Sequence, residues 1–132
     1  METTRRALVV DDDAAIRILV TRILTRDGYT VDAVRDGGEA IEMVLQHEYD
    51  VIALDLMMPR IDGHGVVRYL IDHRPELLDK VIVMTAGGTM ALTKVCPPIG
   101  RFLEKPFDVK RLLAEAAECV PPEDADADVP ES

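Results

Sequence analysis

Short apolar runs alternate along this chain with longer stretches in which apolar residues recur every three or four positions. Three runs have the length of strands, at 7–10, 51–54 and 80–84, of which the last begins with Lys80 and is apolar from Val81 onward. Their continuous apolar character indicates burial on both faces. Alternating apolar and polar residues predict a further strand at 30–34, and a short run predicts another at 101–104. The pattern therefore predicts five strands.

Helical periodicity occupies the intervals between these strands. Asp13 and Asp108 each precede an apolar stripe and are suited to cap a helix, and Asp36-Gly37-Gly38 opens the second helix. Gly28 is the predicted left-handed end of the first helix. The connection at 86–100 is the least regular, with a weak helical pattern at 89–95. The residues predicted to face the core are Ile16, Leu19, Val20, Ile23, Leu24, Ala40, Ile41, Val44, Leu45, Val66, Val67, Leu70, Ile71, Val109, Leu112, Leu113, Ala116 and Ala117.

Strict alternation of strands and helices predicts an α/β fold. Parallel strands joined by right-handed helical crossovers require helices on both faces of the sheet, so we expect a doubly wound five-stranded parallel sheet. A chain of 132 residues suits one domain, which we place at 1–120. Residues 121–132 carry five acidic side chains and no basic one, and we expect a disordered tail or linker there.

Charge and hydropathy exclude several classes of function. The net charge of −10 disfavours direct binding to nucleic acid, whose phosphates require Lys and Arg. No apolar run approaches the roughly 18 residues of a membrane span, and no signal peptide precedes the first strand. We therefore expect a cytoplasmic protein without membrane insertion, in which Cys96 and Cys119 are free thiols.

Polar residues follow four of the five predicted strands at the point where each strand ends. Asp11 and Asp12 follow the first strand, Asp55 the third, Thr85 the fourth and Lys105 the fifth. The carboxyl ends of parallel strands lie at one edge of a sheet, where open α/β sheets bind ligands. We therefore expect these side chains to converge there.

Three converging carboxylates would repel one another unless a cation lay among them. Oxygen ligands of this kind suit Mg²⁺, which also accepts phosphate oxygens. A hydroxyl and an ammonium group opposite the ion could balance the remaining oxygens of a transferred phosphoryl group. Asp55 is then positioned to be the nucleophile.

Four motifs in order resemble the receiver domain of two-component response regulators. They are Leu-Val-Val-Asp-Asp-Asp at 8–13, Leu-Asp-Leu-Met-Met-Pro at 54–59, Val-Met-Thr-Ala at 83–86 and Glu-Lys-Pro-Phe at 104–107. The resemblance covers residues 7 to about 120. It implies the flavodoxin-like strand order 2-1-3-4-5 and a role in phosphorelay signalling.

The resemblance also implies a role for each site residue. Asp55 would accept a phosphoryl group from a phosphohistidine on a histidine kinase or a histidine phosphotransfer protein. Asp11, Asp12, Asp55 and the backbone carbonyl of Met57 would hold Mg²⁺. Thr85 and Lys105 would bind the phosphoryl group, and Phe102 would be the switch aromatic that changes a surface recognised by a downstream protein. The sequence positions that carry these roles are Asp11, Asp12, Asp55, Met57, Thr85, Phe102 and Lys105.

Some positions depart from the family pattern. Pro97-Pro98 shortens the fourth helix, which belongs to the family's usual dimer surface, so a homodimer through that face is doubtful. Phe102 lacks a tyrosine hydroxyl, and His64 stands where an apolar residue is usual.

Two alternatives remain beside a signalling switch that catalyses only its own phosphorylation and dephosphorylation. A Mg²⁺-dependent phosphatase with an aspartyl-phosphate would usually have an acid two residues after its nucleophile, where this chain has Met57. A non-phosphorylated binding module of the same fold would have no need for the complete set of polar residues at the strand ends.

Overall fold

The computed structural model describes residues 5–55, 63–85, 101–105 and 108–119. The Pro97-Pro98 interruption, the weak helical pattern at 89–95, the acidic tail and Cys96 lie outside these residues. The elements in chain order are β1 (Arg5–Val10), α1 (Ala14–Arg26), β2 (Tyr29–Val34), α2 (Gly37–Gln46), β3 (Val51–Asp55), α3 (Gly63–His73), a 3₁₀ helix η1 (Pro75–Lys80), β4 (Val81–Thr85), β5 (Phe102–Glu104) and α5 (Val109–Cys119).

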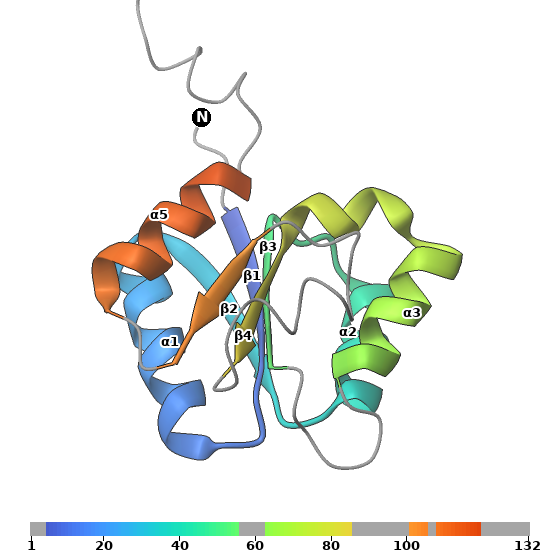
Figure 1. The fold of residues 1–132 in the computed structure, drawn as a ribbon, viewed down its shortest axis with the longest axis horizontal. Coiled ribbons are helices and arrows are strands. Elements are labelled where there is room, and N and C mark those ends of the chain that lie inside the picture. The colour runs from blue at the N-terminus through green and yellow to red at the C-terminus, as the bar shows by residue number, and fades with distance from the viewer. Residues whose placement is uncertain (1–4, 56–62, 86–100, 106–107, 120–132) are drawn as a thin grey trace, which may run out of the picture.

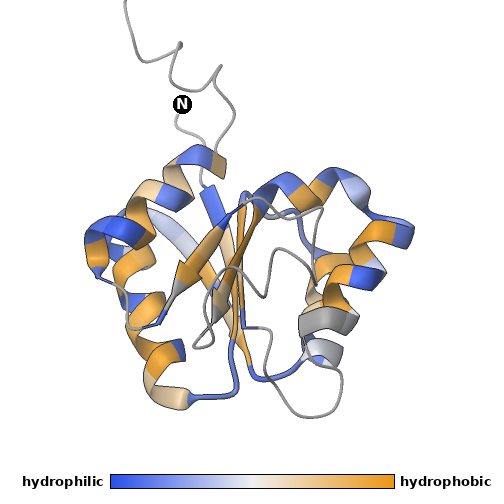
Figure 2. Ribbon diagram, viewed as in Figure 1, coloured by the Kyte–Doolittle hydropathy of each residue, from blue (hydrophilic) through white to orange (hydrophobic). Residues whose placement is uncertain are grey.

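The five strands form one parallel sheet in the order β2-β1-β3-β4-β5, which confirms the predicted fold class and strand order. In Figure 1, α1 and α5 lie on one side of the sheet and α2 and α3 on the other. Apolar residues line the strands and the helix surfaces that pack on them, as the hydrophobic colour in Figure 2 shows.

Side chains divide between two cores because successive residues of a strand point to opposite faces. Leu8 and Val10 of β1 join the core beneath α2 and α3, whereas Ala7 and Val9 join the core beneath α1 and α5. All five residues of β3 are buried. The central strand is therefore covered on both faces, as its unbroken apolar sequence predicts.

Both predicted aspartate caps are present, and Asp36 forms a third. Asp13 accepts hydrogen bonds from the backbone N–H groups of Ala15 and Ile16, and Asp36 accepts one from Glu39. Asp108 Oδ1 accepts a hydrogen bond from the backbone N–H of Arg111 at 2.8 Å. Gly28 has a φ of 101°, the left-handed conformation predicted for the end of α1.

The predicted helix faces were too wide at their edges. Five residues predicted to face the core are exposed: Leu19, Leu45, Ile71, Val109 and Ala117. Four of them adjoin a buried residue of the same stripe, such as Val20 beside Leu19 or Val44 beside Leu45, and Val109 is the first residue of α5. The hydrophobic stripe is therefore broader than the strip of helix that the sheet covers. The prediction also missed η1, which ends at Lys80 and shifts the start of β4 to Val81.

No helix in the described part of the chain combines the length and the apolar character that a membrane span requires.

Candidate phosphoacceptor and metal site

Strand register brings Asp11 beside Asp55. Val10 of β1 pairs with Leu54 of β3, and each aspartate is the next residue along its own chain segment. The backbone N–H of Asp11 donates to the carbonyl of Val34 at 3.2 Å, which extends the contact between β1 and β2 past the last strand residue. Both carboxylates therefore lie at the carboxyl edge of the sheet.

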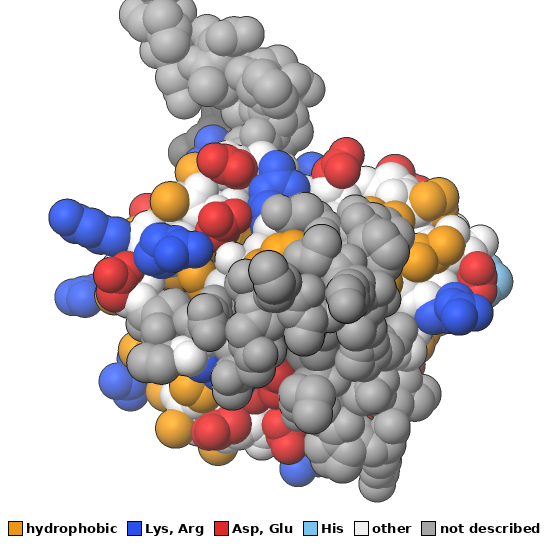
Figure 3. Space-filling model, in the orientation of Figure 1, with side chains coloured by type: hydrophobic (Ala, Val, Ile, Leu, Met, Phe, Trp, Pro, Cys, Tyr) orange, Lys and Arg blue, Asp and Glu red, His pale blue; other side chains and the backbone are white. Residues whose placement is uncertain are grey.

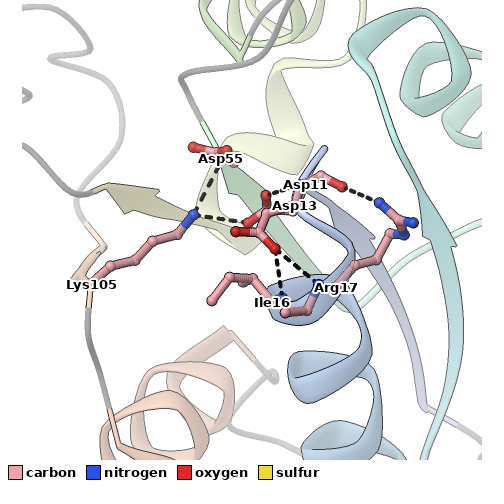
Figure 4. A network of polar contacts seen from close by, with 7 residues as sticks. Asp11, Asp13, Ile16, Arg17, Asp55 and Lys105 are labelled. Carbon is pink, nitrogen blue, oxygen red and sulfur yellow. Dashed lines mark hydrogen bonds and ion pairs between the residues drawn. The ribbon is translucent and has the colours of Figure 1, made fainter.

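Lys105 approaches both carboxylates from the other end of the chain (Figure 4). Its Nζ lies 3.0 Å from Asp11 Oδ2 and 3.7 Å from Asp55 Oδ2. Asp11 is fully buried and Asp55 is 5% exposed, so this ion-pair network is shielded from bulk water. Carboxylates buried to this degree require paired charges or a metal.

The segment Asp11-Asp12-Asp13 is fixed by hydrogen bonds on both sides of Asp12. The backbone N–H of Asp13 donates to Asp11 Oδ1 at 2.9 Å, and the Asp13 carboxylate caps α1. The guanidinium of Arg17 donates to the backbone carbonyl of Asp11 at 2.8 Å. The turn therefore presents Asp11 inward while Asp12 is exposed.

Three carboxylates are close enough to share a cation. One oxygen each from Asp11, Asp12 and Asp55 lies within 4.8 Å of the other two. Hard oxygen ligands from two or three carboxylates, with room for water on the exposed side, match the preference of Mg²⁺. The donor set therefore fits the ion that the sequence predicts. Figure 3 shows acidic side chains at the lower edge of the molecule, where Figure 1 places the carboxyl ends of the strands.

The remaining predicted residues are described to different extents. Thr85 is the last residue of β4 and pairs with Glu104 of β5, which places its backbone at the same sheet edge. Phe102 is half-buried and packs against the core beneath α2 and α3. Met57 lies outside the described residues, and His64 is the second residue of α3.

Arg17 is a residue beside the site that the sequence pattern did not indicate. Its position near the N-terminus of α1 is nevertheless a sequence signal, because a positive side chain is repelled by the positive end of the helix dipole. A cation at such a position indicates a nearby polar partner that offsets this repulsion.

A second polar network, also missed, lies in the layer of β1, β2 and the segment before β3. Asp32 Oδ2 accepts hydrogen bonds from Tyr49 Oη at 2.7 Å and from Arg6 Nε at 3.0 Å. Burial by itself would raise the pKa of Asp32, but the hydrogen bonds from Tyr49 and Arg6 outweigh burial and lower it. Asp32 pairs in register with Leu8, three residues before Asp11, so this network is separate from the three carboxylates.

The strand order, with a polar cluster at the carboxyl edge of the sheet, is that of the flavodoxin-like class of doubly wound α/β domains, which bind ligands at this edge. The sequence model of the response regulator receiver domain matches residues 7–117. The chain therefore belongs to the response regulator receiver family, whose members are switches in two-component signalling and are generally not classed as enzymes.

Curated relatives and solved structures agree with this assignment. The response regulator MprA of Mycobacterium ulcerans is 40% identical over 111 residues, which are 83% of this chain and 47% of MprA. The chain thus spans about half the length of this relative. The chemotaxis response regulator CheY4 of Vibrio cholerae is 26% identical with a TM-score of 0.79, covering 89% of this chain and all of CheY4. The receiver domain of the Francisella response regulator 1452 is 27% identical with a TM-score of 0.76, over 88% of this chain and 96% of that one.

Proposed function

We propose that this chain accepts a phosphoryl group on Asp55 from a phosphohistidine of a histidine kinase or histidine phosphotransfer protein. The observation that carries the proposal is the position of Asp55. It ends a fully buried strand, lies 3.7 Å from the Lys105 ammonium and shares a cluster of oxygens with Asp11 and Asp12. A carboxylate in that position is a nucleophile whose product charge has a cation beside it.

The proposed transfer forms one bond to phosphorus and breaks another. A carboxylate oxygen of Asp55 attacks phosphorus, an O–P bond forms as the N–P bond of phosphohistidine breaks, and the leaving imidazole takes a proton from solvent. Lys105 Nζ lies where it can pair with an oxygen of the arriving group. Thr85, the last residue of β4, is the proposed hydroxyl ligand of another oxygen, a role supported by the position of its backbone at the same sheet edge. Their contribution is positioning and charge stabilisation, which dominate catalysis of phosphoryl transfer.

Asp11, Asp12, Asp55 and the backbone carbonyl of Met57 are the proposed Mg²⁺ ligands. The ion, when bound, neutralises phosphoryl oxygens that would otherwise face three carboxylates. Asp11 and Asp55 offer buried oxygens, and exposed Asp12 leaves the site open to solvent and to a donor protein.

The proposed switch connects Asp55 to Phe102. Phosphorylation adds about two negative charges, and Thr85 moves toward them. Phe102, which is half-buried in β5 beside β4, turns inward as Thr85 moves and alters the surface that a downstream protein recognises.

Residues 1–120 are the proposed receiver unit, followed by the acidic segment 121–132. The net charge of −10 supports protein partners in preference to direct contact with nucleic acid by this segment, and we place its action in the cytoplasm. A homodimer through the family's usual face remains disfavoured by Pro97-Pro98.

The test is the intact mass of the protein after incubation with acetyl phosphate and Mg²⁺, for wild type and Asp55→Asn. One phosphate adduct on the wild type, absent from Asp55→Asn and absent without Mg²⁺, is the expected result. Equal labelling of both proteins would overturn the site assignment. If the wild type takes no phosphate from acetyl phosphate or from phosphohistidine donors, the non-phosphorylated binding module replaces this proposal.

A further inference from the structure

Arg17 contacts the predicted metal-binding turn with both its backbone and its side chain. Its backbone N–H donates to the carbonyl of Asp13 at 2.9 Å, and its Nη1 donates to the carbonyl of Asp11 at 2.8 Å. Figure 4 shows the guanidinium reaching the Asp11 backbone from the side opposite to Lys105. The backbone hydrogen bond is the first of α1 and would form with most residues at this position, so the contribution specific to Arg17 is the side-chain hydrogen bond to the Asp11 carbonyl.

Helix electrostatics do not explain a cation at this place. Arg17 is the fourth residue of α1, where the unpaired N–H groups of the helix give a partial positive charge. The first turn contains no acidic residue, and among the described residues Arg17 forms no ion pair with Asp13, the N-cap four positions before it, whose carboxylate accepts backbone N–H groups instead. The favourable interaction of Arg17 is instead the charge-assisted hydrogen bond to a carbonyl of fully buried Asp11.

We propose that Arg17 is a positioning residue for the Mg²⁺ and phosphoacceptor site, an inference that rests on the proposed function. Asp12 is exposed, so the direction of its carboxylate depends on the main-chain conformation of the turn. The Asp11 carbonyl belongs to the peptide group that joins Asp11 to Asp12, and Arg17 holds that group in place. Asp12 thereby presents its oxygen within 4.8 Å of those from Asp11 and Asp55.

The positioning role and a purely electrostatic role predict opposite effects on metal binding. If Arg17 acted only as a nearby positive charge, removing it would reduce repulsion of Mg²⁺ and tighten binding. If Arg17 positions the turn, removing it releases Asp12 and weakens binding. Residues that orient metal ligands typically contribute about 10- to 100-fold to metal affinity.

The experiment measures the Mg²⁺ dissociation constant by NMR titration of the backbone amides, together with thermal unfolding without metal. The variants are Arg17→Met, Arg17→Lys and, as a matched control on an exposed face of the same helix, Arg22→Met. We expect about 10-fold weaker Mg²⁺ binding in Arg17→Met, partial recovery in Arg17→Lys, which retains a charged donor, and wild-type binding in Arg22→Met. If Arg17→Met fails to fold, Arg17→Gln replaces it, with weakened binding again expected.

Two results would overturn the role of Arg17. One is unchanged or tighter Mg²⁺ binding in Arg17→Met, and the other is an equal weakening in Arg22→Met. A lower unfolding temperature with an unchanged dissociation constant would assign Arg17 to stability alone and also overturn the proposal. A wild type that binds no Mg²⁺ and takes no phosphate would instead refute the proposed function, so the two failures are distinguishable.

Discussion

Lys105 Nζ lies 3.0 Å from Asp11 Oδ2 although 94 positions separate the two residues in the chain. The sheet makes this contact possible, because β1 and β5 both deliver their carboxyl ends to one edge while two strands lie between them. Asp55 ends β3, one of the two strands between β1 and β5, and lies within reach of the same ammonium group. A single cation thus connects both buried carboxylates.

Replacing Lys105 with Met is expected to destabilise the metal-free protein and to increase the stabilisation that Mg²⁺ provides. The change removes the cation shared by two buried carboxylates, at a cost of about 1–3 kcal/mol in the free energy of unfolding. Mg²⁺ would no longer compete with the ammonium for Asp11, so the ion should stabilise the variant more than the wild type. Chemical unfolding with chelator and with Mg²⁺ measures both effects.

Lys110→Met, at an exposed position of α5, is the control for the loss of a positive charge. An equal loss of stability in Lys105→Met with and without Mg²⁺ would contradict the expected competition.

The Lys105→Ala variant tests the proposed switch separately. It should permit some phosphorylation at Asp55 without the shift of NMR signals around Phe102. The same shift in this variant as in the wild type would count against the proposed coupling.

Because Tyr49 donates a hydrogen bond to Asp32, the free energy of unfolding is expected to vary with pH in the acid range. The lowered pKa of Asp32 means that its contribution is complete above the unfolded-state pKa, near 3.9, and is lost as the pH falls through the folded-state value. Tyr49→Phe removes a 2.7 Å hydrogen bond to this carboxylate and should cost about 1 kcal/mol at neutral pH. The difference from wild type should shrink below about pH 4.

Urea unfolding at several pH values measures this dependence. Tyr69→Phe on α3 is the control for the loss of a phenol oxygen outside the network. A difference between wild type and Tyr49→Phe that stays constant down to acid pH would show that the tyrosine acts through packing instead of through Asp32.

Cys119 is expected to resist thiol reagents in the folded protein. Its side chain is buried at the end of α5, and burial raises the pKa of the thiol to about 11. The reactive species is the thiolate, so alkylation near pH 8 should be about 100-fold slower than in the denatured chain. Mass spectrometry of a Cys96→Ser variant, native and in denaturant, isolates Cys119. Equal rates in the two conditions would place the thiol at the surface.

Local sequence determined the five strands and the α-helices of the described residues, though not the 3₁₀ helix η1. Unbroken apolar residues at 51–54 predicted a strand buried on both faces, because only the centre of a parallel sheet has that environment. Asp13 and Gly28 marked the ends of α1, since capping depends on a few adjacent backbone groups. The same logic placed Asp11, Asp55 and Lys105 at one sheet edge, where the structure brings them together.

The sequence did not show how much of each apolar helix stripe is buried. Leu19 and Val20 have the same hydropathic character, yet only Val20 is buried, because the sheet covers a narrower strip of α1 than its apolar stripe. Periodicity records which residues could face a core, and the neighbouring elements decide which of them do.

The sequence by itself thus determined the strands, the described α-helices, their alternation and the residues delivered to the carboxyl edge of the sheet. Only the tertiary structure decided the contacts: Lys105 with Asp11, Tyr49 with Asp32, and Arg17 with the carbonyl of Asp11. The physical reason is that these contacts depend on the separation and direction of groups from different elements, or on a side chain that turns back along its own helix. Hydropathy and residue type contain no such distances.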